Sequence, residues 1–355
     1  DVKSVLTVHR LADGAELRTI DLPIGSVSSF ACERRLSEVF VKFTSFLEPG
    51  IVYRLADVAT ERPLEVVKRT ALAGGFDLSA FETSQHFFDS DDGTKVPMFV
   101  VHRKGLRLDG SNPTLLYGYG GFRIALLPSF SVSRLLWCSH FGGVFALANI
   151  RGGGEYGLQW HDAGKLRQKQ NCFTDFQCAA KFLVAQGFTS ARHLAIEGGS
   201  NGGLLVCACA NQAPALFRAV VSHVGVLDML RFHKFTIGHA WRSDFGDPEK
   251  PEDFGVALAY SPLHNVKRPE DASWQYPSML LLTADHDDRV VPLHSLKFIA
   301  ELQHCAGGAA AQKNPLLAKV DTKAGHGAGK PTSKVIEELS HVYAFVADAT
   351  GAKWA

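Results

Sequence analysis

Residues 194–211 read LAIEGGSNGGLLVCACAN, and this stretch decides the fold. The apolar run Leu194–Glu197 is typical of a buried strand, and Gly203–Asn211 is typical of a helix of apolar and small residues. The turn between them contains Gly-x-Ser-x-Gly, with Ser200 at its centre. A serine on so sharp a turn adopts strained backbone angles, and a side chain two residues away on either side would collide with the strand or the helix. This context predicts that Ser200 is a nucleophile. The alternative is a glycine-rich turn in which Ser200 only caps the helix.

From about residue 73 onward, apolar strands alternate with helices on both sides of this turn. The predicted strands are Val96–His102, Thr114–Leu116, Gly143–Ile150, Leu194–Glu197, Ala219–Val224, Met279–Thr283 and Leu316–Val320. The predicted helices are Phe173–Gln186, Gly203–Asn211, Leu293–His304 and Ser333–Asp348. Such alternation indicates an α/β fold with a doubly wound, mostly parallel sheet that helices cover on both faces.

The first 73 residues differ from the rest. They contain four short runs rich in β-branched and aromatic residues, at 5–9, 16–20, 38–43 and 51–55. Their spacing is typical of propeller blades, but only about two blades fit, and a closed propeller needs at least about four. We therefore expect a partial propeller at 1–73 and a second domain at 74–355. The chain begins with Asp1, without the features of a signal peptide. This start predicts either processing or a piece of a longer polypeptide.

The composition argues against several function classes. The chain has 37 Lys and Arg against 36 Asp and Glu, so its net charge of +1 provides no field that would attract nucleic acid. No apolar run approaches the roughly 18 residues that a membrane span needs. The seven cysteines form no C-x-x-C pair of a zinc or redox site. We interpret them as small apolar core residues of a protein in a reducing compartment.

The predicted nucleophile needs two partners. A serine hydroxyl is a weak nucleophile, so a histidine must accept its proton and an acid must orient that histidine. With this type of turn, the acid and then the base follow the serine in the sequence. A loop after Met279–Thr283 holds Asp285, Asp287 and Asp288, and the pattern alone leaves the choice among them open. His326, flanked by Gly and Ala, is the candidate base. The other late histidines lie in or beside predicted helices or next to the aspartates, and fit less well: His286, His294, His304 and His341.

Five motifs together resemble the prolyl oligopeptidase (prolyl endopeptidase) family. They are YGYGGF at 117–122, NIRGGGEYG at 149–157, GGSNGG at 198–203, DHDDRVVP at 285–292 and GHGAG at 325–329. They occur in that family's order and at its spacing, and the similarity covers essentially the whole chain. The resemblance implies an α/β-hydrolase domain preceded by the last blades of a seven-bladed propeller. It also implies that the family's N-terminal segment and earlier blades, which cap the active site, are not part of this chain.

The resemblance also implies the roles of individual residues. Ser200 is expected to be the nucleophile, Asp287 the acid and His326 the base. Tyr119 matches a tyrosine whose hydroxyl, with the backbone N–H of Asn201, forms the oxyanion hole. A phenol there donates a hydrogen bond where negative charge develops on the tetrahedral intermediate.

Substrate specificity follows from the same resemblance. Trp241 matches an indole that stacks on the substrate proline ring. The residues expected to line the apolar proline pocket are Phe122, Val226, Ile237, Phe245 and Val290. Arg289 matches an arginine that hydrogen-bonds a substrate carbonyl, although an ion pair with Asp285 or Asp288 is an alternative for it. Phe245 departs from a tyrosine common in the family, which removes a hydroxyl from the pocket wall.

The implied function is a serine peptidase that cleaves short peptides after proline through an acyl-enzyme intermediate. Neither a metal nor an organic cofactor is expected. The resemblance and the unpaired cysteines imply a cytoplasmic location, and the resemblance favours a monomer. Two alternatives stay open at this point. One is another specificity, such as acyl-peptide release or ester hydrolysis. The other is a catalytically silent fragment, since the capping and packing elements of the family are absent from the sequence.

Overall fold

A large sheet organises most of the chain in the computed structural model, which describes residues 2–60, 62–271, 273–327 and 330–355. Its eight strands lie in the order β14-β13-β12-β11-β9-β10-β8-β7. The strands are β7 (Phe81–Asp89), β8 (Lys95–Arg103), β9 (Thr114–Tyr117), β10 (Val144–Ala148), β11 (Leu194–Gly199), β12 (Ala219–His223), β13 (Ser278–Ala284) and β14 (Leu316–Asp321). The six strands β9, β10, β11, β12, β13 and β14 are parallel, and β8 of the β7–β8 hairpin pairs antiparallel with β10. The predicted mostly parallel sheet is confirmed.

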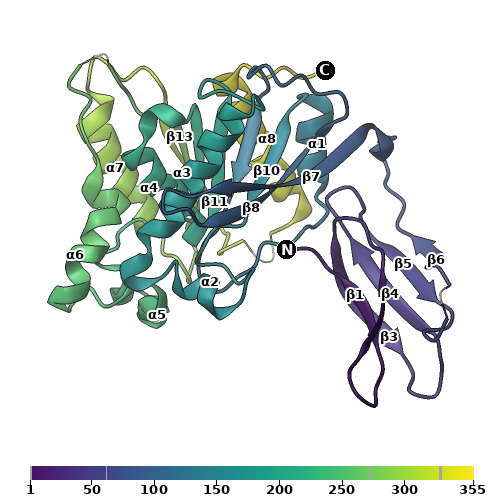
Figure 1. The fold of residues 1–355 in the computed structure, drawn as a ribbon. Coiled ribbons are helices and arrows are strands. Elements are labelled where there is room, and N and C mark those ends of the chain that lie inside the picture. The colour runs from purple at the N-terminus through teal and green to yellow at the C-terminus, as the bar shows by residue number, and fades with distance from the viewer. Residues whose placement is uncertain (1, 61, 272, 328–329) are drawn as a thin grey trace.

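Helices cover both faces of this sheet (Figure 1). The longer helices are α1 (Val132–His140), α3 (Gln170–Ala185), α4 (Asn201–Gln212), α6 (Pro251–Tyr260), α7 (Leu293–Leu302) and α8 (Thr332–Thr350), with short helices α2 (Leu158–Asp162) and α5 (Arg242–Phe245). One apolar core joins the sheet to α3, α4 and α7, and a second joins its other face to α1 and α8. Alternating side chains of each central strand enter the two cores, as expected for a sheet buried on both sides. Within the described residues, no helix is long and apolar enough to cross a membrane.

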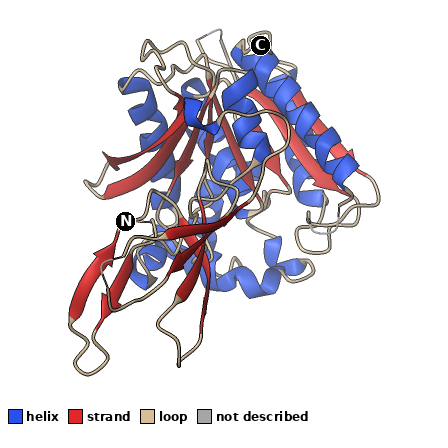
Figure 2. Cartoon of the chain, turned by 90° about the vertical axis from the view of Figure 1, so that its right-hand side faces the viewer, coloured by secondary structure: helices blue, strands red, loops and turns tan. Residues whose placement is uncertain are grey.

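The described residues between 2 and 69 form two small antiparallel sheets. The strands β1 (Leu6–His9) and β2 (Glu16–Ile20) form a hairpin. The strands β3 (Ser26–Cys32), β4 (Val39–Thr44), β5 (Ile51–Leu55) and β6 (Glu65–Arg69) form a four-stranded meander, which is the size of one propeller blade. Figure 2 shows these strands projecting from the helix-covered part of the molecule. The chain therefore provides one complete blade and a hairpin, where the sequence suggested room for about two blades.

Aromatic packing joins the blade to the large sheet. Phe46, in the turn after β4, is 5% exposed and lies with its ring centroid 5.5 Å from that of Phe99 and 6.2 Å from that of Phe145. Both partners belong to the core beneath α1 and α8. In addition, the Ser26 hydroxyl donates a buried hydrogen bond to the Pro128 carbonyl at 2.8 Å. The blade is thus anchored to the α/β part by a buried aromatic contact.

Candidate active site

The Ser200 turn has the strained geometry that its sequence predicts. Ser200 lies between β11 and α4 with φ of 56° and ψ of −114°. This is a left-handed conformation that residues other than glycine rarely adopt. A Cβ atom at position 198 would lie 2.2 Å from the Gly202 carbonyl oxygen, and one at position 202 would lie 2.7 Å from the Gly118 carbonyl oxygen. The Ser200 N–H donates to the His223 carbonyl at 2.8 Å, which fixes the turn to the end of β12.

His326 is held by Asp287 and by neither of the other two aspartates of the loop. The His326 ring nitrogen Nδ1 lies 2.7 Å from Asp287 Oδ2. The other carboxylate oxygen, Oδ1, accepts the backbone N–H groups of Arg289 at 3.0 Å and Val290 at 2.9 Å. These three hydrogen bonds satisfy a carboxylate that is only 3% exposed. Asp285 bonds instead to the neighbouring His286 at 2.6 Å, and Asp288 is exposed.

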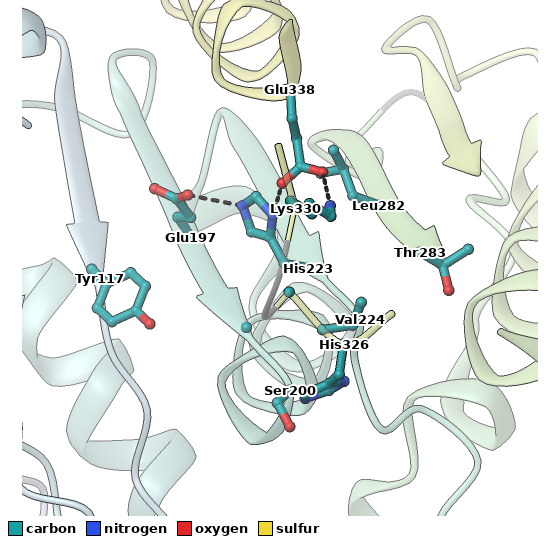
Figure 3. A pocket seen from close by; sticks show the side chains of 12 residues that line it. Tyr117, Glu197, Ser200, His223, Val224, Leu282, Thr283, His326, Lys330 and Glu338 are labelled. Carbon is teal, nitrogen blue, oxygen red and sulfur yellow. Dashed lines mark hydrogen bonds and ion pairs between the residues drawn. The ribbon is translucent and has the colours of Figure 1, made fainter. Parts of the chain in front are cut away.

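Ser200 and His326 line one cavity of about 400 Å³. Figure 3 shows the two side chains next to each other at one end of it. They come from the carboxyl-terminal ends of β11 and β14, while Asp287 follows β13. In parallel α/β sheets this edge is where binding and catalytic groups converge. Residues 328 and 329, the end of the GHGAG motif, lie outside the described residues.

Two hydrogen-bond donors are placed at Ser200. The Asn201 backbone N–H begins helix α4 and bonds to no acceptor in the described part of the chain. Tyr119 lines a second cavity together with Ser200. Burial raises the pKa of the Tyr119 phenol to about 12, against a smaller lowering contribution from its hydrogen bond with Ser200, so the hydroxyl keeps its proton at neutral pH. A backbone N–H and a protonated phenol are suitable donors for a developing oxyanion.

The second cavity has a volume of about 240 Å³ and an apolar wall. It is lined by Tyr119, Phe122, Ser200, Val226, Ile237, Trp241 and Arg289. The Trp241 indole lies parallel to the Phe232 ring, with an interplanar angle of 16° and centroids 6.3 Å apart. No carboxylate belongs to this lining among the described residues. The cavity therefore offers a flat aromatic surface and one cation, Arg289.

Two predicted pocket residues lie behind the wall instead of lining it in the described structure. Phe245 is 1% exposed and packs edge-to-face on Phe122, with centroids 5.4 Å apart. Val290 is equally buried. Arg289 is exposed, and no ion pair joins it to Asp285 or Asp288 within the described residues. It stays available to a ligand in the cavity.

Comparison with known proteins identifies the family. Residues 128–353 match the model of the prolyl oligopeptidase family, and residues 1–69 match that of the prolyl oligopeptidase N-terminal β-propeller domain. The chain belongs to the prolyl oligopeptidase family.

Relatives from several organisms agree with this membership. The chain is 47% identical over 318 residues to prolyl oligopeptidase ophP of Omphalotus olearius, covering 90% of this chain and 42% of that protein. It is 43% identical over 354 residues to a prolyl endopeptidase of Dictyostelium discoideum, covering 99% of this chain and 45% of that protein. The chain thus spans about half the length of the curated relatives it matches.

Solved structures of the family superimpose on the whole chain. Prolyl oligopeptidase B of Galerina marginata, bound to a 35-residue hydrolysis and macrocyclization substrate, matches with a TM-score of 0.90 and 38% identity, over 100% of this chain and 49% of that one. A prolyl endopeptidase studied for inter-domain dynamics matches with a TM-score of 0.89 and 43% identity, over 99% and 50%.

In this prolyl oligopeptidase family chain, two residues that the sequence does not reveal, Asp244 and Lys169, hold the Tyr119 loop. Asp244 is 3% exposed, accepts the Phe122 N–H at 2.7 Å and pairs with His161 at 3.1 Å. Lys169 is 1% exposed and donates to the Gly120 carbonyl at 2.7 Å. Phe122 has φ of 55°, so its strained loop requires such anchors. Both residues lie in polar stretches that look solvent-facing, so hydrophobic periodicity gives no signal for them.

A charged cluster occupies the far end of the cavity shared by Ser200 and His326 (Figure 3). His223 Nε2 lies 2.9 Å from Glu197, and Nδ1 lies 3.7 Å from Glu338, which also pairs with Lys330 at 2.5 Å. Burial disfavours the charged form of His223, but the two carboxylates outweigh burial and raise its pKa to about 9. The bond to His223 and the ion pair with Lys330 lower the pKa of Glu338 to about 2.

No cluster of His, Cys, Asp and Glu suited to a metal ion occurs among the described residues. The seven cysteines are free thiols, and five of them are buried: Cys138, Cys172, Cys178, Cys207 and Cys209. Most of the cysteines are thus core residues, as the sequence indicated.

Proposed function

We propose that this chain carries the catalytic site of a serine peptidase that cleaves short peptides on the carboxyl side of proline. The observation that carries the proposal is the joining of Ser200, His326 and buried Asp287 at one sheet edge, beside an aromatic cavity that Ser200 also lines. Family membership supports it, since the relatives are named prolyl oligopeptidases and prolyl endopeptidases.

The proposed mechanism follows from the positions of these groups. His326 Nε2 accepts the proton of Ser200 as Oγ attacks the carbonyl carbon of the proline residue. Asp287 stabilises the imidazolium through Nδ1. The Tyr119 hydroxyl and the Asn201 N–H stabilise the oxyanion of the tetrahedral intermediate. His326 then protonates the leaving amine, and water hydrolyses the acyl-enzyme by the same steps in reverse order.

The proposed specificity rests on the cavity around Trp241. A pyrrolidine ring is flat and apolar, so it fits a wall of one indole, Phe122 and two aliphatic side chains. Arg289 is proposed to donate to a substrate backbone carbonyl. A basic side chain would meet this cation and find no carboxylate in the described lining, so cleavage after Lys or Arg is not favoured.

We further propose a division into a partial propeller at 1–73 and a peptidase domain at 74–355. The division is supported by the separate sheets on either side of residues 70–80. The rest of the propeller is proposed to belong to another part of the polypeptide or to a separate chain, because the chain spans about half of its relatives. A cytoplasmic location is proposed, with the free buried thiols as support. A monomer is proposed from the family membership alone.

The test is hydrolysis of a blocked Gly-Pro fluorogenic peptide by the wild-type chain and by Ser200→Ala. Blocked Arg and acyl-Ala reporters serve as competitors, and a fluorophosphonate probe reports whether Ser200 is activated. We expect turnover of the Gly-Pro reporter that Ser200→Ala abolishes, together with labelling that depends on Ser200. Preference for the Arg or acyl-Ala reporter would overturn the assigned specificity. Absence of both labelling and turnover in folded protein would overturn the proposed activity of this chain.

A further inference from the structure

Lys169 is the most unusual charged residue near the site. It is 1% exposed and lies at the N-terminal end of helix α3. Its ammonium donates to the Gly120 carbonyl at 2.7 Å and to Asn201 Oδ1 at 3.1 Å, and it lies 5.3 Å from the centroid of the Phe245 ring. No carboxylate lies within ion-pair distance of it in the described part of the chain.

This placement is unfavourable for the fold by itself. A buried cation loses its hydration, and proteins ordinarily compensate with a carboxylate partner. The positive end of the α3 helix dipole adds a further unfavourable interaction. Two neutral oxygen acceptors and an aromatic ring are the compensation present here. A methionine would fill the same volume without these costs, so the charge requires another explanation.

The two acceptors of Lys169 belong to the segments that supply the proposed oxyanion donors. Gly120 directly follows Tyr119, which supplies one proposed oxyanion donor, and Asn201 supplies the other through its backbone N–H. Lys169 therefore bonds to the neighbour of the first donor residue and to the side chain of the second. The Asn201 side-chain amide also donates to the Tyr119 carbonyl, which closes a ring of contacts between the loop and the start of α4. Phe122 and Arg123, which follow in the same loop, have φ of 55° and 56°, a strained conformation for residues with a side chain, so the loop depends on external anchors.

We propose that Lys169 is a positioning residue that fixes the distance between the Tyr119 hydroxyl and the Asn201 N–H. It acts through the Gly120 carbonyl and the Asn201 amide and does not contact the substrate. This inference rests on the proposed function, because it assigns a role within the same oxyanion site. Donor positions shifted by about 1 Å reduce catalysis on the order of 100-fold, so loss of the tether should be measurable.

The test separates oxyanion binding from pocket binding. A blocked Gly-prolinal is an aldehyde whose carbonyl carbon bonds to Ser200 Oγ, while the Ser200 proton moves to His326 and the carbonyl oxygen becomes the oxyanion. The matching prolinol occupies the same pocket and forms no bond. Inhibition constants for both are measured on wild type, Lys169→Met, Lys169→Gln, Tyr119→Phe and the double variant Lys169→Met/Tyr119→Phe. Val346→Ala, in the core beneath α8 on the opposite face of the sheet, serves as the control for lost stability.

We expect Lys169→Met to weaken prolinal binding by about 10- to 100-fold while prolinol binding is unchanged. Lys169→Gln should give the same pattern, and either variant suffices if the other does not fold. In the double variant the two losses should combine to less than their product. Without Lys169 the Tyr119 hydroxyl is displaced and contributes less to prolinal binding, so its removal weakens binding less than it does in wild type. Val346→Ala should alter neither inhibition constant.

Three results would overturn the inference: unchanged prolinal binding in the folded Lys169 variants, equal weakening of both ligands, or fully multiplicative losses in the double variant. If the wild-type chain itself fails to bind prolinal, the proposed function is wrong and the inference falls with it. Wild-type binding with unaffected variants overturns the inference alone.

Discussion

Replacing Asp287 by Asn changes one atom of the buried carboxylate and should invert the hydrogen bonding of His326. In the wild type, Oδ1 accepts two backbone N–H groups and Oδ2 lies 2.7 Å from His326 Nδ1. In Asp287→Asn the amide oxygen must stay with the N–H groups of Arg289 and Val290. Turning the amide would leave both backbone donors facing an NH₂ group, at about 1–3 kcal/mol for the buried Val290 N–H and less for the part-buried Arg289 N–H.

The amide NH₂ therefore faces His326 Nδ1, which must then accept a hydrogen bond. This selects the tautomer with the proton on Nε2, so the ring donates to Ser200 Oγ and cannot take its proton. A triad with this wrong tautomer loses about 10⁴-fold in kcat, equivalent to about 5 kcal/mol of transition-state stabilisation. The peptide pocket is untouched, so KM should change little.

The assay is kcat for the blocked Gly-Pro reporter, with the rate of fluorophosphonate labelling as a second readout. Asp288→Asn is the matched control, since Asp288 is an exposed aspartate of the same turn. We expect the control to remain within a few-fold of wild type. A fall of less than tenfold for a folded Asp287→Asn, or an equal fall for the control, would refute the assignment of His326 and Asp287.

Two further predictions concern the cluster and the pocket. The pKa of His223 is raised to about 9, above its ordinary 6.5, so its stabilising charge is fully present below pH 6.5 and is lost as the pH rises through 9. Denaturant unfolding should show wild type losing on the order of 3 kcal/mol more than His223→Gln across this pH range, and parallel profiles would contradict the ion-pair account. Trp241→Ala removes an aromatic wall worth about 1.5–3 kcal/mol and should lower kcat/KM for the Gly-Pro reporter about 10- to 100-fold, mainly through KM. An unchanged preference for Gly-Pro over a blocked Gly-Ala reporter would show that the indole does not select proline.

The sequence predicted the central sheet well because its strands are buried on both faces. Met279–Leu282, for example, is continuously apolar, and the observed strand β13 (Ser278–Ala284) is only one residue longer at each end than the predicted Met279–Thr283. The strands β3 and β6 were missed for the opposite reason. Their side chains are mostly exposed, and their sequences SVSSFAC and EVVKR show no clear apolar alternation. Helix α1 was missed because it spans only nine residues, although its side chains are amphipathic and Ser131 caps it by accepting the Arg134 N–H.

The order of the site residues was predictable, but their orientation was not. Spacing alone left three aspartates open, since residues 285, 287 and 288 share one loop. The distinguishing feature is the turn at 287–290, which directs two backbone N–H groups toward Asp287. The contacts of Lys169 and Asp244 with the Tyr119 loop were even less predictable from the sequence. Their acceptors and donors belong to a loop with positive φ at Gly120 and Phe122, and such backbone contacts leave no pattern in a sequence.

The placement of the three site residues in the loops that follow β11, β13 and β14 has a consequence for folding. Asp287 and His326 are 39 positions apart, and Ser200 lies still further from both, so the site forms only through contacts of long sequence separation. Such contacts form late, because the entropy of closing long loops must be overcome before they stabilise anything. Among the described strands, the edge strand β14 pairs only with β13, and the loop after it holds His326, the last of the three site residues along the chain. We therefore expect reactivity of Ser200 toward a fluorophosphonate to report formation of the part of the sheet from β11 to β14, and a partly folded state without docked β14 to stay unreactive.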